Sequence, residues 1–374
     1  MTTEFWNRQA EQNKIKTKFV TEYFPAWARI MAPRTKPNYY NPQGNLGYCD
    51  FFSGPGSFSD GNISTPLFVV NHILQNKNYC EKFILNFNDA DPKNIDRLKE
   101  NIETLDDIHL LKNSPCYSCV SLDVDTPLDF FNCLNYPTLY FVDPFGYKGI
   151  TMDLLKKCLD SHGSDIILFF NYNRVSTSFT NPKVIHHMKA LYTDSIYNST
   201  VELLNEIYVP QEKEALLINR FIYAIQRNCN AMAFPFRFQF ENKKSTSHYI
   251  FFLTHNETAL GIMKDIMWKW SSEKDNGIAN FSFLPNQPIE QQLNLIDMVD
   301  DKFEELKRDL MTNFKGQIRN VTYICSRYST TIYIKRNIKS ALKSLEKENK
   351  IRCDPPFQNR RANTIADHVN VIFK

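Results

Sequence analysis

The sequence predicts an α/β protein in which a mostly parallel sheet is interrupted by a helical insertion and followed by a smaller second domain. Three observations lead to this fold class. Apolar runs alternate with helical patterns over the first two thirds of the chain, and the first run ends abruptly in Gly54-Pro55-Gly56. The charge then changes, since residues 301–374 carry a net +8 and the remainder a net −5. A length of 374 residues is about two domains' worth.

The parallel sheet is predicted from the order of strands and helices. The first helix, 12–33, carries Phe19, Tyr23 and Trp27 at spacings of four residues, so these side chains share one face. The expected strands are 47–52, 82–87, 116–122, 137–142 and 165–170, and the expected helices between them are 64–75, 91–104 and 151–160. Because the strands are continuous apolar runs, we expect helices on both faces of the sheet.

The sheet is expected to resume after an insertion. Residues 173–228 have helical patterns, and the runs 230–240 and 248–254 indicate an antiparallel pair joined by a loop. A helix at 256–271 follows. We therefore expect a first domain over residues 1–278 that contains the helical insertion at about 173–228.

Residues 301–374 predict a winged-helix-like domain. Helix, turn and second helix are followed by two strand-like runs, IRCDPP and VNVIFK, and such a module places one helix in a duplex groove. The basic side chains expected to hold a nucleic-acid backbone, DNA or RNA, are Lys335, Arg336, Lys339 and Lys343. A basic packing or dimerisation domain has the same composition, and the sequence leaves both alternatives open.

Composition excludes several classes of protein. The N-terminal residues lack the basic start and apolar core of a secretory signal, and no apolar run reaches the ~18 residues of a membrane span. Nine cysteines, an odd number scattered along the chain, fit a reducing cytoplasm. Cys116 and Cys119 have CxxC spacing but lack further ligands nearby, and the histidines form no HExxH pair, so we expect no metal site.

Acidic residues and glycines follow four consecutive predicted strands. Ligands of open parallel sheets bind beyond the carboxyl ends of the strands. Asp50 and the two glycines end the first strand, and Asp89 follows the second, where a carboxylate can accept both hydroxyl protons of a ribose. Asp123 follows the third strand and Asp143 the fourth. Any one of them alone is more typical of a turn or a helix cap, but the set indicates a ligand that carries adenosine.

These segments resemble the class I S-adenosylmethionine-dependent methyltransferases, which have a Rossmann-like sheet, and within that group the bacterial three-Cys-motif partner protein family. The resemblance spans nearly the whole chain. It rests on KTKFVTEYFPAWARIM (16–31), YCDFFSGPGSFSDGNISTPL (48–67), DADP (89–92), YFVDPFG (140–146), ALKSLEKENKIR and RRANTIADHVNVIF. The three cysteines of the family name belong to the partner protein, so the resemblance implies a cysteine-motif partner and requires no such motif here.

The resemblance implies S-adenosylmethionine as the cofactor. It assigns cofactor-binding roles to Asp50, Gly54, Gly56, Asp89, Asp123 and, as a lysine before the first long helix, Lys18. Asp89 would hold the ribose hydroxyls and Asp123 the adenine, whereas Asp143 would lie beside the sulfonium and the incoming nucleophile. Asn171 and Arg174, just past the fifth strand, are expected to face the substrate.

The segment Asp143-Pro144-Phe145-Gly146 is similar to the D/N-P-P-Y/F motif of enzymes that methylate exocyclic amines of bases, and closer still to the DPFG of tRNA guanosine dimethyltransferases. In that motif the acidic group accepts the amine hydrogens, the aromatic ring stacks on a flipped base, and the proline fixes the backbone. The second proline of the motif is Phe145 here, so stacking falls to Phe145, to Tyr147 or to neither. A simple strand-to-loop turn is the alternative.

Two functions of different class remain. The first is a cytoplasmic methyltransferase that acts on nucleic acid at a base amine. The second is a non-catalytic, methyltransferase-like subunit that serves a cysteine-motif protein in a phage-related or mobile-element module. Methylation of that partner protein or of a small molecule is a weaker third possibility, and a steep salt dependence of substrate binding distinguishes nucleic acid from both.

Overall fold

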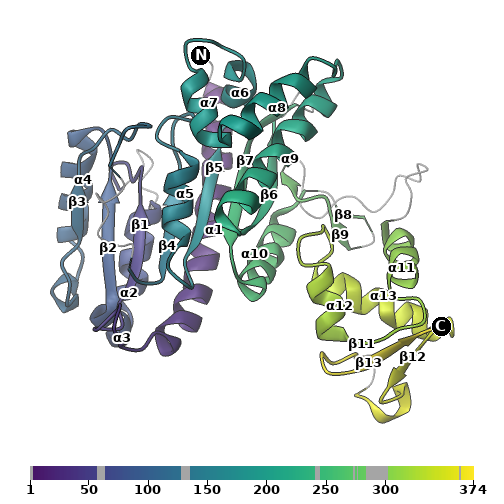
Figure 1. Ribbon diagram of the computed structural model, residues 1–374. Helices are drawn as coiled ribbons and strands as arrows, with labels where there is room; N and C mark the ends of the chain where they lie inside the picture. The colour runs from purple at the N-terminus through teal and green to yellow at the C-terminus, as the bar shows by residue number, and fades with distance from the viewer. Residues whose placement is uncertain are drawn as a thin grey trace. The chain divides into compact units, whose positions relative to one another are not determined.

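The computed structural model describes residues 3–56, 64–127, 135–240, 245–272, 274–275, 277–283, 302–361 and 364–374, with the backbone alone for residues 3–14 and 275 (Figure 1). The chain divides into two compact units that meet between Ala259 and Leu260. We had expected the first domain to extend to residue 278. The extents of the functional domains, 1–278 and 301–374, stay predictions.

The first unit contains nine α-helices and seven strands among its described residues. The helices are α1 (Thr3–Arg34), α2 (Thr65–Leu74), α3 (Lys77–Lys82), α4 (Pro92–Glu103), α5 (Met152–Leu159), α6 (Tyr172–Ser178), α7 (Ile185–Tyr192), α8 (Asp194–Leu204) and α9 (Pro210–Cys229). The strands are β1 (Leu46–Asp50), β2 (Phe83–Asn88), β3 (Cys116–Ser118), β4 (Thr138–Val142), β5 (Asp165–Phe170), β6 (Met232–Gln239) and β7 (Thr246–Thr254). The predicted sequence of strands is confirmed, whereas the short helix α3 was not predicted.

The strands of this unit follow the order β6-β7-β5-β4-β1-β2-β3. Strands β1 to β5 pair in parallel, and β7 pairs antiparallel with both β5 and β6. The strand order therefore reverses between β1 and β4, which is the switch point at which open α/β sheets bind their ligands. This arrangement confirms the α/β fold with a largely parallel sheet.

Alternate side chains of the strands point to opposite faces, and helices cover both. Tyr48 of β1 packs against Phe24 of α1, with ring centroids 5.7 Å apart, and Phe19 of α1 reaches Phe236 of β6. The neighbouring Cys49 belongs to the apolar cluster of the other face, which includes α5, α7, α8 and α9. The helical insertion therefore forms one of the two layers on the sheet.

Helix α1 crosses one face of the sheet, from the carboxyl ends of the strands to their amino ends. Tyr23 donates a hydrogen bond of 2.6 Å to Asp165, at the start of β5, and Trp27 donates one of 3.1 Å to the carbonyl of Gly163. Lys16, two turns earlier, contacts Asp143 just beyond the end of β4. The helix is thus fixed at the amino edge of the sheet and carries a lysine to the carboxyl edge.

The second unit contains the winged-helix arrangement. Its elements are α10 (Glu257–Trp270, which spans the limit between the units), β8 (Lys274–Asp275), β9 (Ile278–Ala279), β10 (Ser282–Phe283), α11 (Lys302–Asn313), β11 (Ile318–Asn320), α12 (Val321–Arg327), α13 (Lys335–Lys347), β12 (Ile351–Asp354) and β13 (Asn370–Phe373). The two predicted wing strands pair antiparallel, and β11, which was not predicted, adds a third strand in the order β11-β13-β12. Leu306, Ile338, Leu342 and Val371 belong to the core that these elements enclose.

Within the described ranges of both units, no helix combines the length and the apolar character needed to cross a membrane.

Candidate functional site

The candidate site lies at the carboxyl edge of the sheet, around the switch point. Parallel pairing brings the ends of β1, β2 and β4 side by side, with Asp50 opposite Phe87 of β2 and opposite Phe141 of β4. Asp50, Asp89 and Asp143 therefore meet at one edge although they are far apart in the sequence. The structure brings together three of the predicted strand-end carboxylates.

The glycine turn after β1 is tied to the end of β2. The backbone nitrogen of Gly54 donates 2.9 Å to Oδ2 of Asp89, and Ser53 donates its backbone N–H and its hydroxyl to the carbonyl of Asn88. Gly54 has φ +61° and a Cβ there would meet nothing within 4 Å, so open space borders the backbone. Gly56 has φ +83° and packs against Leu98, whose Cδ1 would lie 2.7 Å from a Cβ. The following residues 57–63, which include the whole SFSDG segment, lie outside the described residues.

Asn88 is a residue of this edge to which the sequence assigned no role. Its amide nitrogen donates to the carbonyls of Phe51 and Val120, at 3.1 and 3.0 Å. Its amide oxygen accepts from the hydroxyl of Ser118 and from the nitrogen of Val120, both at 3.0 Å. One buried side chain thus joins the ends of β1, β2 and β3. Its position directly before Asp89 is a signal available in the sequence, because a buried amide at a strand end must find such partners.

Asp89 and Asp143 place negative charge beside the buried carboxyl group of Asp50. Asp50 is 1% exposed, accepts a hydrogen bond of 3.1 Å from the nitrogen of Phe52 and receives the hydroxyl of Tyr48 at 3.5 Å. Burial raises the pKa of Asp50 well above its usual range, and the negative charges of Asp143 and Asp89 raise it further. The edge therefore favours a ligand that brings positive charge.

The DPFG segment presents a carboxylate and an exposed ring. Asp143 is half-buried, Pro144 is buried, and the Phe145 ring is 94% exposed. Tyr147 is partly buried, with its ring 5.7 Å from that of His187. Of the two aromatic side chains considered for stacking, Phe145 is the one that a planar substrate can reach.

Of the two residues expected to face the substrate, Arg174 borders DPFG and Asn171 caps the helix that carries it. A Cβ on Gly146 would lie 3.4 Å from Cδ of Arg174, so this arginine is packed beside the segment. Asn171 accepts a hydrogen bond of 3.2 Å from the nitrogen of Arg174 and caps α6.

Lys16, to which the sequence assigned no role, lies at this edge, and the cofactor role of Lys18 stays a prediction. The Nζ atom of Lys16 lies 3.2 and 3.3 Å from the two carboxyl oxygens of Asp143, and 3.2 Å from the centroid of the Phe169 ring. Lys18 is on the exposed side of α1. Lys16 reaches the edge because the helical period places it on the same face of α1 as Val20, Tyr23 and Trp27.

A buried histidine lies close to Lys16. The His248 ring is 5% exposed and packs against Phe169 and Phe238, at centroid distances of 4.2 and 4.4 Å. Its Nδ1 is 2.8 Å from the hydroxyl of Ser247, and its Nε2 has no hydrogen-bond partner among the described residues. Burial lowers the pKa of His248 well below its usual range, and the charge of Lys16 adds to that effect.

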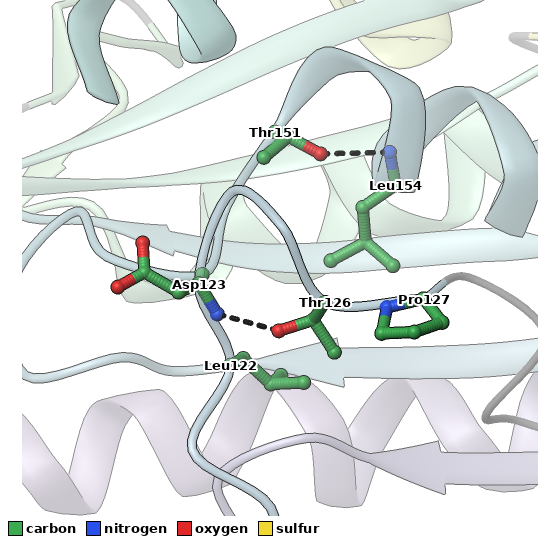
Figure 2. A pocket seen from close by; sticks show the side chains of 7 residues that line it. Leu122, Asp123, Thr126, Pro127, Thr151 and Leu154 are labelled. Atoms are coloured by element: carbon green, nitrogen blue, oxygen red, sulfur yellow. Dashed lines mark hydrogen bonds between the residues drawn. The ribbon is translucent and has the colours of Figure 1, made fainter. Parts of the chain in front are cut away.

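Asp123 lines a small pocket beside the loop that follows β3. Figure 2 shows this pocket, which is lined by Leu122, Asp123, Thr126, Pro127, Gly149, Thr151 and Leu154. The hydroxyls of Thr126 and Thr151 accept from the nitrogens of Asp123 and Leu154, at 2.8 and 3.0 Å. The Asp123 carboxylate lies 3.4 Å from Nδ1 of His187. Its role toward an adenine stays a prediction.

In the second unit, the predicted nucleic-acid-binding side chains lie on α13. Lys335 and Lys339 both form ion pairs with Asp367, the latter at 2.7 Å. The Arg336 guanidinium lies over the ring of Trp268, 4.9 Å from its centroid. Lys343 is half-buried on the same helix. The cations are gathered on one element, but Asp367 neutralises part of their charge.

Comparisons with known proteins support the C-terminal domain directly. Residues 282–356 match the family model described as a GMT-like wHTH domain, which confirms the predicted winged-helix domain. The curated proteins contain no match to this chain.

Several solved structures share parts of the fold. Protein LPL1258 from Legionella pneumophila is similar over 65% of this chain and 84% of that chain, with 10% identity and a TM-score of 0.37. The methyltransferase domain of bacterial CtHen1-C is similar over 63% and 98%, with 10% identity and a TM-score of 0.30. Geranyl diphosphate methyltransferase in complex with GPP and sinefungin is similar over 62% and 78%, with 9% identity and a TM-score of 0.27. With TM-scores below 0.5, these likenesses are the basis of no functional assignment.

Proposed function

We propose that this chain is an S-adenosylmethionine-dependent methyltransferase that acts on an exocyclic amine of a nucleic-acid base. The sheet order supports the first half of this proposal. A parallel sheet in the order β3-β2-β1-β4-β5, extended by the antiparallel β7 between β5 and β6, is the strand arrangement of the class I methyltransferase fold. In such a sheet the reactants bind at the switch point.

The observation on which the proposal chiefly rests is the charge of that edge. The negative charges of Asp89 and Asp143 raise the pKa of the buried Asp50, and Lys16 is the basic side chain paired with Asp143. A pyrophosphate-bearing dinucleotide would be repelled by the carboxylate charge that Lys16 leaves unpaired, whereas a sulfonium cation is attracted. The edge therefore suits S-adenosylmethionine better than a nicotinamide or flavin dinucleotide.

The residues present fit that cofactor. The space beside Gly54 lets a ligand approach the backbone, and Asp89, which already orders the glycine turn, retains acceptor capacity on Oδ2. In this proposal Asp50 and the two glycines face the methionine and ribose side, Asp89 accepts from the ribose hydroxyls, and Asp123 faces the adenine.

The chain's own residues position the acceptor. The bound cofactor supplies an electrophilic methyl group on sulfur. Asp143 accepts a hydrogen bond from the acceptor amine and directs the nitrogen lone pair toward that carbon, while Phe145 stacks on the base. The nitrogen would gain the methyl group and the positive charge, and the neutral thioether of the cofactor would leave. The proton that the nitrogen then loses goes to the Asp143 carboxylate.

A second candidate is favoured by one observation in the winged-helix unit. Lys335 and Lys339, the lysines expected to contact phosphates, are both paired with Asp367. This arrangement suits a methyltransferase-like subunit whose winged helix contacts a protein, such as a cysteine-motif partner in a phage-related or mobile-element module.

Calorimetric titration with S-adenosylmethionine tests the proposal. We expect micromolar binding by the full chain and a loss of about 100-fold in affinity for Asp89→Ala, because two hydrogen bonds to a carboxylate are removed. Asp96→Ala, an exposed carboxylate of the adjoining helix α4, is the matched control and should bind like the wild type.

A second measurement addresses the acceptor. We expect label from methyl-labelled cofactor to enter the amine positions of bases in DNA or RNA. The absence of cofactor binding by the folded wild type would refute the methyltransferase proposal and leave the partner-subunit candidate. Cofactor binding with transfer to protein alone would refute the nucleic-acid half.

A further inference from the structure

The Lys16 ammonium occupies a position built for a nitrogen cation. It lies within 3.3 Å of both oxygens of Asp143 and 3.2 Å from the centroid of the Phe169 ring. A carboxylate beside an aromatic face binds ammonium groups well, since the ring quadrupole adds to the ionic attraction. The Lys16 side chain is 14% exposed and the Asp143 side chain 25%, so the pair is screened from much of the solvent.

The surroundings of this ammonium give it little other stabilisation. Burial lowers the pKa of Lys16, and the charge and hydrogen bond of Asp143 act against that effect. The neighbouring His248 is buried, and its pKa lies well below the usual range, so it adds no positive charge near neutral pH. Asp143 is therefore the group that holds the ammonium at this edge.

The fold explains why Lys16 takes this position. Tyr23 and Trp27 fix the following turns of α1 to Asp165 and to Gly163 at the opposite edge of the sheet. Lys16 precedes Tyr23 by seven residues, or two helical turns, on the same face. The long side chain is thereby delivered to the carboxyl edge by a helix anchored elsewhere, independently of any ligand.

We propose that Lys16 is the resting counter-ion of Asp143 and that its ammonium stands where the acceptor amine binds during methyl transfer. This inference rests on the proposed function. It makes Lys16 a positioning residue, because the lysine neutralises the carboxylate next to the sulfonium until an acceptor amine takes its place. In the resting protein, the Lys16–Asp143 pair is neutral overall, so it contributes about equally to the binding of a cationic and of a neutral cofactor.

The relative affinity for S-adenosylmethionine, a cation, and S-adenosylhomocysteine, its neutral thioether product, reports this charge. Lys16→Met leaves Asp143 unpaired, so we expect the affinity ratio to shift toward the cation by about tenfold or more. Asp143→Asn leaves Lys16 unpaired, and we expect a shift of similar size in the opposite direction. Lys16→Arg keeps the charge and should retain most of the wild-type ratio.

Calorimetric titration of the full-length variants with both ligands makes the measurement. Arg29→Met, an exposed cation of the same helix, is the control for a general loss of positive charge. Since the ratio compares two ligands on one protein, a small loss of stability cancels. If Lys16→Met does not fold, Asp143→Asn alone decides the sign of the shift.

The outcomes separate this inference from the proposed function. If both ligands bind all variants with the wild-type ratio, the methyltransferase proposal stands and the counter-ion role of Lys16 is refuted. If neither ligand binds the folded wild type, the proposed function fails and this inference fails with it. Opposite shifts in Lys16→Met and Asp143→Asn, with none in Arg29→Met, would establish the role.

Discussion

The carboxyl edge of the sheet and the α13 face of the winged-helix unit differ in how far their charged side chains are neutralised by local ion pairs. At the sheet edge, Asp89 and Asp143 raise the pKa of the buried Asp50, and Lys16 pairs with Asp143. On α13, two lysines share the single carboxylate of Asp367. The first region thus retains more negative charge than its cation offsets, whereas the second has part of its positive charge offset within the domain.

The difference shows that the charge of a segment and the charge available to a ligand are separate quantities. The net positive charge of residues 301–374 is obvious in the sequence, yet part of it is neutralised in the structure by ion pairs with Asp367. The acidic edge is invisible as a segment, because its members come from the ends of three different strands. Spatial convergence and local pairing therefore decide which of the two regions can recognise a ligand by charge.

Substitution of Asp143 tests the acidic edge with the largest expected effect. We expect Asp143→Ala to retain binding of S-adenosylhomocysteine but to lower methyl transfer by 10² to 10³-fold, roughly the loss for one group that orients or stabilises the transition state. Single-turnover transfer of labelled methyl to nucleic acid measures this. Normal turnover by the variant would show that Asp143 is a turn residue.

Lys264 tests how the second unit stabilises a buried cation. Its side chain is 3% exposed, and Nζ donates to the carbonyls of Ser329 and Tyr333 at 2.9 and 2.8 Å. Burial lowers the pKa of Lys264 to about 7. The unfolded chain, with a pKa near 10.4, binds a proton that the folded chain lacks between these values, so the free energy of unfolding should rise with pH.

We expect the rise due to Lys264 to be about 2 kcal/mol between pH 7 and pH 9. Urea unfolding of the full chain at both pH values measures it, and Lys264→Met should remove that part of the slope. An unchanged slope in the variant would mean that the two carbonyl groups keep the ammonium charged throughout this range. The two carbonyl groups would then act together with the negative charge of Asp265, whereas Lys16 at the sheet edge forms a direct ion pair.

Much of this contrast could be predicted from the sequence, because strand ends are visible in it. The apolar runs ending at Asp50 and before Asp89 and Asp143 locate the edge, and parallel pairing then brings them together. The winged helix was likewise evident from helix order and the final strands. Side-chain pairing was not predictable, since the partner of each charge is set by tertiary packing.

Two cases show where that limit falls. The position of Lys16 at the sheet edge was not predicted, although the face that it shares with Tyr23 and Trp27 follows from the helical period, and the cofactor role of Lys18 stays a prediction. Asp367 lies 32 residues from Lys335, and no local pattern joins them. The first was a matter of helical phase, which a sequence contains, and the second depends on how the wing folds back onto α13.

Phe145 tests whether the sheet edge also recognises its substrate without charge, because a phenyl ring would contact a base by stacking. Its ring is 94% exposed, so Phe145→Ala should change stability by no more than about 0.5 kcal/mol. We expect methyl transfer to a base to fall about tenfold, as for the loss of one stacking contact, and Phe145→Trp to retain most of it. Tyr40→Ala, another exposed ring, is the control. Equal transfer by Phe145→Ala and wild type would leave the segment without a stacking role.

The smallest effect is expected from releasing the α13 lysines. Asp367→Asn frees Lys335 and Lys339 from their ion pairs, so affinity for duplex nucleic acid should increase a few-fold at low salt and its logarithmic salt dependence should steepen by up to about two ions. Asp354→Asn, an exposed carboxylate of β12, is the control. Unchanged affinity and salt dependence would mean that these lysines do not meet phosphates. The charge on α13 would then be a structural tie between helix and wing, and any substrate contact would have to come from elsewhere in the chain, which favours the partner-subunit candidate for the second unit.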